Sequence, residues 1–163
     1  MLDKLKESIE KLEDSEEYEE YMKDNKGSYL VSGFLILEDG DWQIDYYSPS
    51  SGMVTAFLVR EKVKVKPESQ AFQKEKKKIE ELDLEKIKVN FEEAMEIVEK
   101  VRKEKYETET ANKKIIVLQN LEDLGQVWNI TLITHSFKTL NVKVDCKNGE
   151  VKSEGLTSVI NFG

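Results

Sequence analysis

Residues 126–151 read QVWNITLITHSFKTLNVKVDCKNGEV, and this stretch decides the fold that the sequence predicts. Apolar and polar side chains alternate over 127–134 and again over 139–145, which is the period-two pattern of half-buried strands. Asn148 and Gly149 then favour a type I′ hairpin turn, because both central residues of such a turn need positive φ. Three consecutive antiparallel strands are therefore predicted here.

A helix precedes a group of strands twice along the chain. Leu2, Leu5 and Ile9 begin an apolar stripe at helical spacing. Asn90 and Glu93 match a capping box, which opens a second helix. Outside the stretch quoted above, one helix is expected at 2–24 and a second that starts at 90 and ends before a polar loop at 108–112. Strands are expected at 29–37, 41–47, 53–66 and 114–121.

The order helix, strand, strand, strand thus occurs twice, and a shift of 86 positions aligns the two copies. This shift places Trp42 on Trp128 and Ala56 on Val142, with apolar positions matched although identity is low. A degenerate internal duplication is therefore expected.

The predicted fold class is α+β, with two helix-plus-antiparallel-sheet units in tandem. The first, degenerate unit covers 1–66 and the second covers 86–163. Pro67 can open a helix at its first turn, so a charged connecting helix is predicted within 67–85.

Charge and cysteine content exclude several classes of function. Lys and Arg number 25 against 33 Asp and Glu, which gives a net charge of −8. An acidic chain gains little from neutralising phosphates, so nucleic acid is not expected as a partner. A lone cysteine, Cys146, permits neither an internal disulfide nor a cysteine-based zinc site, and no metal-ligand spacing suggests a cofactor. The excess of Lys over Arg suggests a heat-loving source, since Lys and Glu enrichment marks hyperthermophile proteins.

No targeting signal is visible in the sequence as it stands. No stretch approaches the roughly 20 apolar residues of a transmembrane helix. Residues 1–17 also lack the apolar region of a signal peptide. The expected location is cytoplasmic, or exported or anchored if an upstream signal was removed.

His135 and Cys146 form the one pair that suggests nucleophilic catalysis. If the turn lies at Ser136 and Phe137, Cys146 lies beside Val127, about eight positions from His135 along the ladder. At ~3.3 Å per residue the separation is roughly 25 Å, far beyond hydrogen-bond reach. We therefore predict an exposed His135 and a half-buried Cys146.

Asp41 and Asp45 suggest an acid/base pair in a pocket. Residues four apart on one strand lie roughly 13 Å apart, which is too far for a retaining hydrolase pair. A solvated strand face is the better interpretation, and no enzyme is expected.

The aromatic residues divide into core and surface candidates. Trp42 and Trp128 alternate with other apolar positions and are predicted core residues. Phe137 lies at a predicted hairpin tip with little core to join, so His135, Ser136 and Phe137 are the predicted partner-binding residues. A longer loop that folds Phe137 back toward the core is the alternative.

The second half of the chain, roughly 86–152, resembles the PepSY domain family. The features that carry this resemblance are the helix opening Ile87-x-Val89-x-x-x-x-Ala94-x-x-Ile97, the pair Val127-Trp128 and the ending DCKNGEV at 145–151. The resemblance implies a cystatin-like arrangement, in which a helix packs across an antiparallel sheet, and no catalytic residues. It also implies a role in restraining peptidases or binding other proteins, in exported or membrane-anchored settings.

The leading hypothesis is thus a non-enzymatic protein-binding or regulatory module that contacts another protein through hairpin tips or a free sheet edge. The resemblance implies a peptidase as the class of partner. A small-ligand carrier or cone-fold enzyme with a pocket between helix and sheet is the alternative. A homodimer formed by edge-strand pairing is a third hypothesis.

Overall fold

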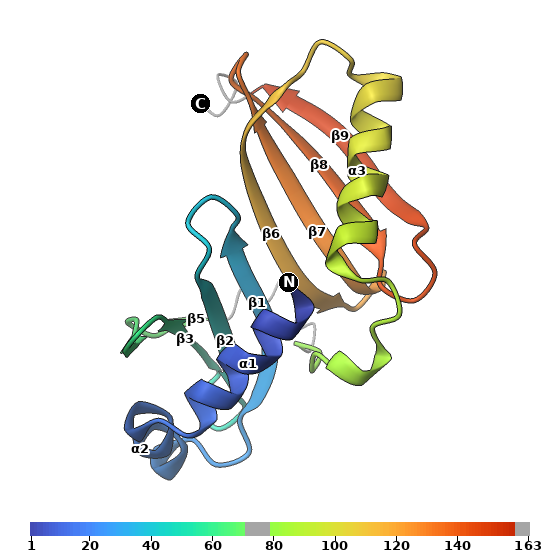
Figure 1. Ribbon diagram of the computed structural model, residues 1–163. Helices are drawn as coiled ribbons and strands as arrows, with labels where there is room; N and C mark the ends of the chain where they lie inside the picture. The colour runs from blue at the N-terminus through green and yellow to red at the C-terminus, as the bar shows by residue number, and fades with distance from the viewer. Residues whose placement is uncertain (71–78, 159–163) are drawn as a thin grey trace.

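A computed structural model describes residues 1–70 and 79–158, which build one antiparallel sheet with helices on it (Figure 1). The helical elements are α1 (Leu2–Glu13), α2 (Glu16–Asp24), α3 (Phe91–Lys105) and a 3-10 turn at Leu84–Lys86. The strands are β1 (Tyr29–Ile36), β2 (Trp42–Ser48), β3 (Met53–Val59), β4 (Val63–Val65), β5 (Ser69–Gln70), β6 (Ala111–Leu121), β7 (Gly125–Thr134), β8 (Lys138–Asp145) and β9 (Val151–Ser158). The predicted α+β class is confirmed.

All the long strands belong to a single sheet. Its order is β4-β3-β2-β1-β6-β7-β8-β9, and β5 pairs with one end of β3. At the centre β1 and β6 are antiparallel, with Phe34 opposite Val117. The chain therefore runs outward from this central pair in both directions, first through β2, β3 and β4 and later through β7, β8 and β9.

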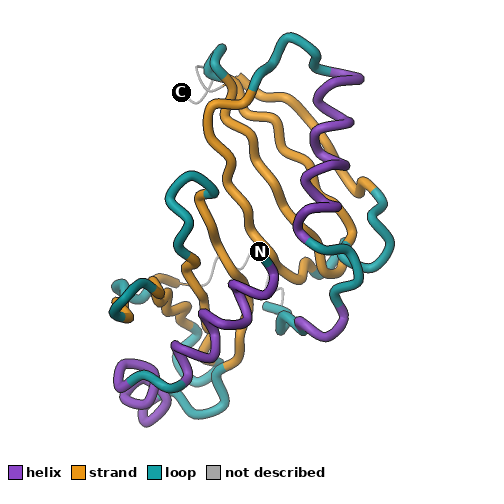
Figure 2. Tube along the Cα trace, viewed as in Figure 1, coloured by secondary structure: helices purple, strands orange, loops and turns teal. Residues whose placement is uncertain are grey.

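Helices α1 and α3 cover the same face of this sheet (Figure 1, Figure 2). Helix α1 contacts β2 and β3, and α3 contacts β7 and β8. Trp42 and Trp128 point to this face and are fully buried, so their predicted core role is confirmed. Trp128 Nε1 donates to the carbonyl of Val89 at 2.9 Å, just before α3 begins.

The predicted helix at 2–24 is two helices. Ser15 separates α1 from α2, and its Oγ accepts a hydrogen bond from the Tyr18 amide at 3.2 Å. A serine side chain that caps a new helix competes with continued helix at that position, which explains the break.

The predicted long strand at 53–66 is a hairpin of β3 and β4 that turns after Val59. The predicted alignment of the third strands is also wrong by one position. Ile44 pairs with Phe57, and Ile130 pairs with Val142. Phe57, which is fully buried, therefore occupies the place of Val142, whereas we predicted Ala56 there.

In the described part of 67–85 the chain forms no α-helix, contrary to the prediction, and only the 3-10 turn that starts at Leu84 is helical. Residues 69–70 form β5, 79–83 are not helical, and 71–78 lie outside the described residues. The Leu82 amide donates to the Leu30 carbonyl at 2.9 Å. The Gln126 side chain accepts from the Asp83 amide at 2.6 Å and donates to the Asp83 carbonyl at 3.0 Å. These tertiary bonds hold the backbone extended and override its local helix propensity.

The hairpin predicted at Asn148 and Gly149 is present, but its turn is not type I′. Only Gly149 has positive φ, at 77°. The Gly149 amide donates to the Asp145 carbonyl at 2.9 Å, and Asp145 Oδ1 accepts from the Lys147 amide at 2.6 Å. The Asp145 side chain thus shapes a longer turn.

Candidate functional site

The connection between β7 and β8 consists of His135, Ser136 and Phe137, all exposed. We call these three residues the tip. A two-residue turn at Ser136 and Phe137 was predicted, and this is wrong because Ile133 pairs with Thr139, which leaves three residues in the loop. Three-residue hairpin loops commonly end in a residue with left-handed backbone conformation, here Phe137.

Phe137 combines an unfavourable backbone conformation with an outward side chain. Its φ is 59°, and it is the one non-glycine residue with positive φ in the ranges 1–70 and 79–158. A Cβ atom in this region costs roughly 1–2 kcal/mol. Its side chain is 69% exposed, so it does not fold back onto the core. The chain therefore holds an aromatic ring in solvent at a position that favours glycine.

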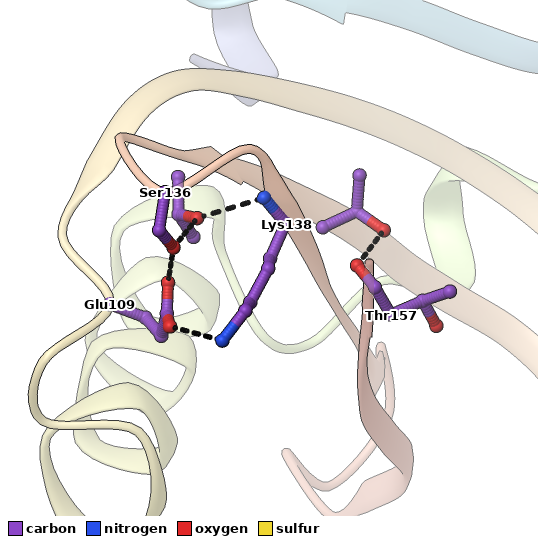
Figure 3. A network of polar contacts seen from close by, with 6 residues as sticks. Glu109, Ser136, Lys138 and Thr157 are labelled. Carbon is purple, nitrogen blue, oxygen red and sulfur yellow. Dashed lines mark hydrogen bonds and ion pairs between the residues drawn. The ribbon is translucent and has the colours of Figure 1, made fainter. Parts of the chain in front are cut away.

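A buried carboxylate lies directly beneath the tip (Figure 3). Glu109, in the loop between α3 and β6, is only 6% exposed. Its Oε2 accepts a hydrogen bond from Ser136 Oγ, and its Oε1 lies 3.1 Å from Lys138 Nζ. Thr134 Oγ1 lies 3.1 Å from Ser136 Oγ and accepts from the Lys138 amide at 3.2 Å. Both ends of the three-residue loop are therefore tied to one polar network.

The backbone around Glu109 is itself anchored to α3 and β7. The Arg102 guanidinium donates to the Glu109 carbonyl at 3.3 Å and is fixed in turn by Glu99 at 2.8 Å. The His135 amide donates to the Thr110 carbonyl at 3.0 Å. The hydrogen bond from Ser136, followed by contributions from Thr134 and Lys138, lowers the pKa of Glu109 below its ordinary value. The carboxylate is accordingly ionised at neutral pH.

His135 and Cys146 lie at opposite ends of β7 and do not form a dyad. The Cys146 amide donates to the Gln126 carbonyl at 3.0 Å, so Cys146 lies beside Gln126 and not beside Val127 as predicted. Cys146 is fully buried, whereas half-burial was predicted. The loop before α3 covers it, and the Val89 amide of that loop donates to the Cys146 carbonyl at 2.8 Å. Burial raises the pKa of the Cys146 thiol to about 12. The exposure of His135 is confirmed.

The two carboxylates near the aromatic strands have separate partners. Asp41 Oδ2 accepts from Arg60 Nε at 2.9 Å. Asp45 accepts from Ser32 Oγ at 2.7 Å and from Gln43 Nε2 at 3.0 Å, and burial raises its pKa. Asp45 is thus half-buried, whereas a solvated face was predicted. Within the described residues no group of three or more His, Cys, Asp or Glu side chains could hold a metal ion.

The comparison with known proteins yields a fold likeness. No protein-family model matches the chain, and no curated protein matches it. A solved structure of a "putative lipoprotein" from Clostridium difficile 630 is similar, with a TM-score of 0.53 and 17% identity. The match covers 85% of this chain and 88% of that one, so the two share the arrangement of helices and sheet. In the described part of this chain no helix is long and apolar enough to cross a membrane.

Glu109 and Lys138 are the site residues that sequence reasoning missed. The tip follows from the strand pattern, but Glu109 lies 26 positions before His135 in a polar loop. No periodicity or spacing marks this glutamate among 33 acidic residues. Only the pairing of β6 with β7 brings the loop at 106–110 under the tip.

Proposed function

We propose that the chain is a non-enzymatic, PepSY-like protein-binding module that contacts its partner through His135, Ser136 and Phe137. The observation that carries the proposal is Phe137, an exposed aromatic ring in a left-handed backbone conformation above a buried Glu109. Backbone strain of this kind persists where surrounding structure supports it, and it is concentrated at functional sites. Exposed aromatic side chains are also common anchors of protein interfaces.

The edges of the sheet support the tip as the contact surface, because both edges carry features that prevent strand pairing. On β9, Glu154 points under α3, where it lies 3.1 Å from Lys105 Nζ and accepts from the Tyr106 hydroxyl at 2.8 Å. The other edge, β4, is three residues long and is flanked by the exposed Lys62 and Lys66. Inward charges, lysines and short strands are devices that protect sheet edges. These features disfavour a homodimer formed by pairing of edge strands. We therefore expect light scattering to give the molar mass of a single chain.

The strand order supports the tandem-unit interpretation. Reading outward from the central β1–β6 pair, each side has three further strands, and a helix contacts the first two of them, α1 on β2 and β3 and α3 on β7 and β8. We propose that the sheet descends from a duplicated PepSY-like unit. The resemblance of the second half to this family makes a peptidase the proposed partner class.

We further propose that the protein acts in an exported or anchored setting. The support is the shared fold with the "putative lipoprotein" from Clostridium difficile 630 and the exported settings of the PepSY family. Fractionation of the source cells, followed by detection of the chain in each fraction, tests this proposal. Recovery in the cytoplasmic fraction alone would contradict it.

Affinity capture from a lysate of the source organism tests the binding function. Wild type, Phe137→Ala and Val65→Ala are run in parallel, because Val65 is the other large apolar residue of the described chain that is strongly exposed, at 43%. We expect a partner that wild type and Val65→Ala retain and that Phe137→Ala loses. A partner retained equally by all three variants would show that the tip is not the contact.

A small-ligand carrier is the second candidate, and one cleft favours it. A cleft of about 770 Å³ lies between α1 and residues 80–86 and is bordered by Tyr18, Tyr29 and Tyr46. Its volume lies in the range of ligand sites. The space directly between the helices and the sheet, however, is filled by side chains such as Leu5 and Trp128, which are fully buried. Thermal-shift screening is expected to give no stabilising ligand, and a reproducible rise in melting temperature would favour the carrier.

A further inference from the structure

We infer that Glu109 is a positioning residue: it holds the tip in one conformation, so that Phe137 is already oriented before any partner arrives. This inference rests on the proposed function of the tip and adds its control by a residue on another loop. Glu109 does not contact the proposed partner, because it is 6% exposed beneath the loop.

The contacts of Glu109 reach both sides of Phe137. One carboxylate oxygen binds Ser136, the residue before Phe137, and the other lies 3.1 Å from Nζ of Lys138, the residue after it (Figure 3). The Phe137 amide also donates to the Thr134 carbonyl at 3.1 Å. A single side chain thus fixes the two neighbours of the strained residue, whereas Phe137 itself, at 69% exposure, does not belong to the core that the described residues form.

The backbone conformation of Phe137 explains why such a brace is needed. The left-handed conformation of Phe137, with φ of 59°, is disfavoured for a residue with a Cβ atom, so an unbraced loop would relax to other backbone states. The Glu109 carboxylate opposes this relaxation on both sides of Phe137, because it accepts from Ser136 Oγ and lies 3.1 Å from Lys138 Nζ. A braced tip also loses less conformational entropy on binding, which raises affinity without a new contact.

The charges around Glu109 come from three elements. Lys138 approaches from β8, and Arg102 on α3 binds the Glu109 carbonyl and not its carboxylate. Glu107, on the same loop, is exposed and its carbonyl accepts a longer bond of 3.4 Å from Arg102. Among the described residues the Glu109 carboxylate therefore has one cationic partner, Lys138. Removal of the carboxylate frees Lys138 and Ser136 together.

Backbone ¹⁵N relaxation of the full chain tests the inference without a partner. In wild type we expect order parameters of about 0.85 at Ser136 and Phe137, equal to those in β7 and β8. In Glu109→Ala they should fall below about 0.6 at the tip alone. Glu109→Gln keeps an acceptor oxygen without the charge and should give intermediate values.

Two further variants make the outcome specific. Glu154→Gln removes a carboxylate that is likewise held by a lysine and a hydroxyl, but away from the tip, and should leave the tip rigid. Ser136→Ala removes the exposed donor to Glu109 without risk to the core and should loosen the tip as well. Unchanged order parameters at Phe137 in both Glu109→Ala and Ser136→Ala would overturn the inference. A rigid tip with no captured partner would instead contradict the proposed function and leave the brace standing.

Discussion

The loop between β2 and β3 and the loop between β7 and β8 occupy corresponding places in the two halves of the sheet, and they differ in one instructive way. Both follow a strand that ends in a buried hydroxyl residue, Ser48 or Thr134, each 1% exposed. In both, that hydroxyl lies close to the serine two positions on, at 3.0 Å from Ser50 and at 3.1 Å from Ser136. The two loops thus share a polar base.

The residues that close the loops in left-handed conformation are different. Gly52 has φ of 70°, and its amide donates to the Ser48 carbonyl at 2.8 Å, whereas Phe137 has φ of 59°. Glycine takes this conformation without a steric penalty and phenylalanine does not. Among residues 1–70 and 79–158, a buried carboxylate binds the serine of the second loop, that of Glu109, and none binds the serines of the first. The β2–β3 loop thus connects its strands without backbone strain. The β7–β8 loop carries in addition an exposed phenylalanine ring and the buried Glu109 that supports it.

The largest expected effect concerns the core under α3, at the end of β7 opposite to the second loop. Trp128→Ala should lower the free energy of unfolding by ~3–5 kcal/mol, because the ring is fully buried and packs 5.8 Å from the Phe91 ring. Urea denaturation at neutral pH measures it. A loss below about 1 kcal/mol would show that this half of the core tolerates a cavity.

Replacement by phenylalanine should cost different amounts of stability at the two tryptophans. Trp128 Nε1 donates to the Val89 carbonyl, whereas Trp42 Nε1 is buried with no acceptor among the described residues. Trp128→Phe should therefore cost about 1 kcal/mol more than Trp42→Phe. Equal losses in urea denaturation would mean that the hydrogen bond to Val89 adds nothing to stability.

Exchanging the closing residues tests the comparison of the loops directly. Phe137→Gly should stabilise the protein by about 0.5–1 kcal/mol, since it relieves the backbone strain and removes little burial. Gly52→Ala should destabilise it by about 1 kcal/mol, although open space surrounds that position. Melting temperatures of both variants provide the measurement. A less stable Phe137→Gly would show that the phenylalanine ring contributes packing.

The smallest expected effect is in the pH dependence of the free energy of unfolding. Glu109 in the second half of the sheet and Asp45 in the first half should contribute to it with opposite sign. Glu109 has a folded pKa below its unfolded value of about 4.3, so its stabilisation is complete above that pH and is lost as pH falls through the folded pKa. Asp45 has a raised folded pKa, so its ionisation weakens the fold as pH rises past its unfolded value of about 3.9.

Unfolding free energies of wild type, Glu109→Gln and Asp45→Asn, compared between about pH 3 and pH 6, measure these contributions. On acidification, the advantage of wild type over Glu109→Gln should shrink, and wild type should gain relative to Asp45→Asn. Parallel pH profiles for all three proteins would contradict both assignments.

Local sequence determined much of this molecule. The alternation in 126–145 defines β7 and β8, Asn90 caps α3 through the Glu93 amide at 2.8 Å, and the buried tryptophans follow from the same period-two pattern. These features depend on the side-chain spacing of neighbouring residues, which the sequence displays directly. The exposed position of the tip follows from them.

Tertiary structure alone decided the rest. The pairing of β1 with β6, the extended backbone at Leu82 and the burial of Glu109 under Ser136 each join residues at least 27 positions apart. Sequence spacing carries no signal for such contacts, because their hydrogen bonds form only after the sheet has brought distant segments together. Phe137 shows both effects: its exposure follows from the strand pattern, whereas its left-handed conformation depends on a three-residue register and on a carboxylate from another loop.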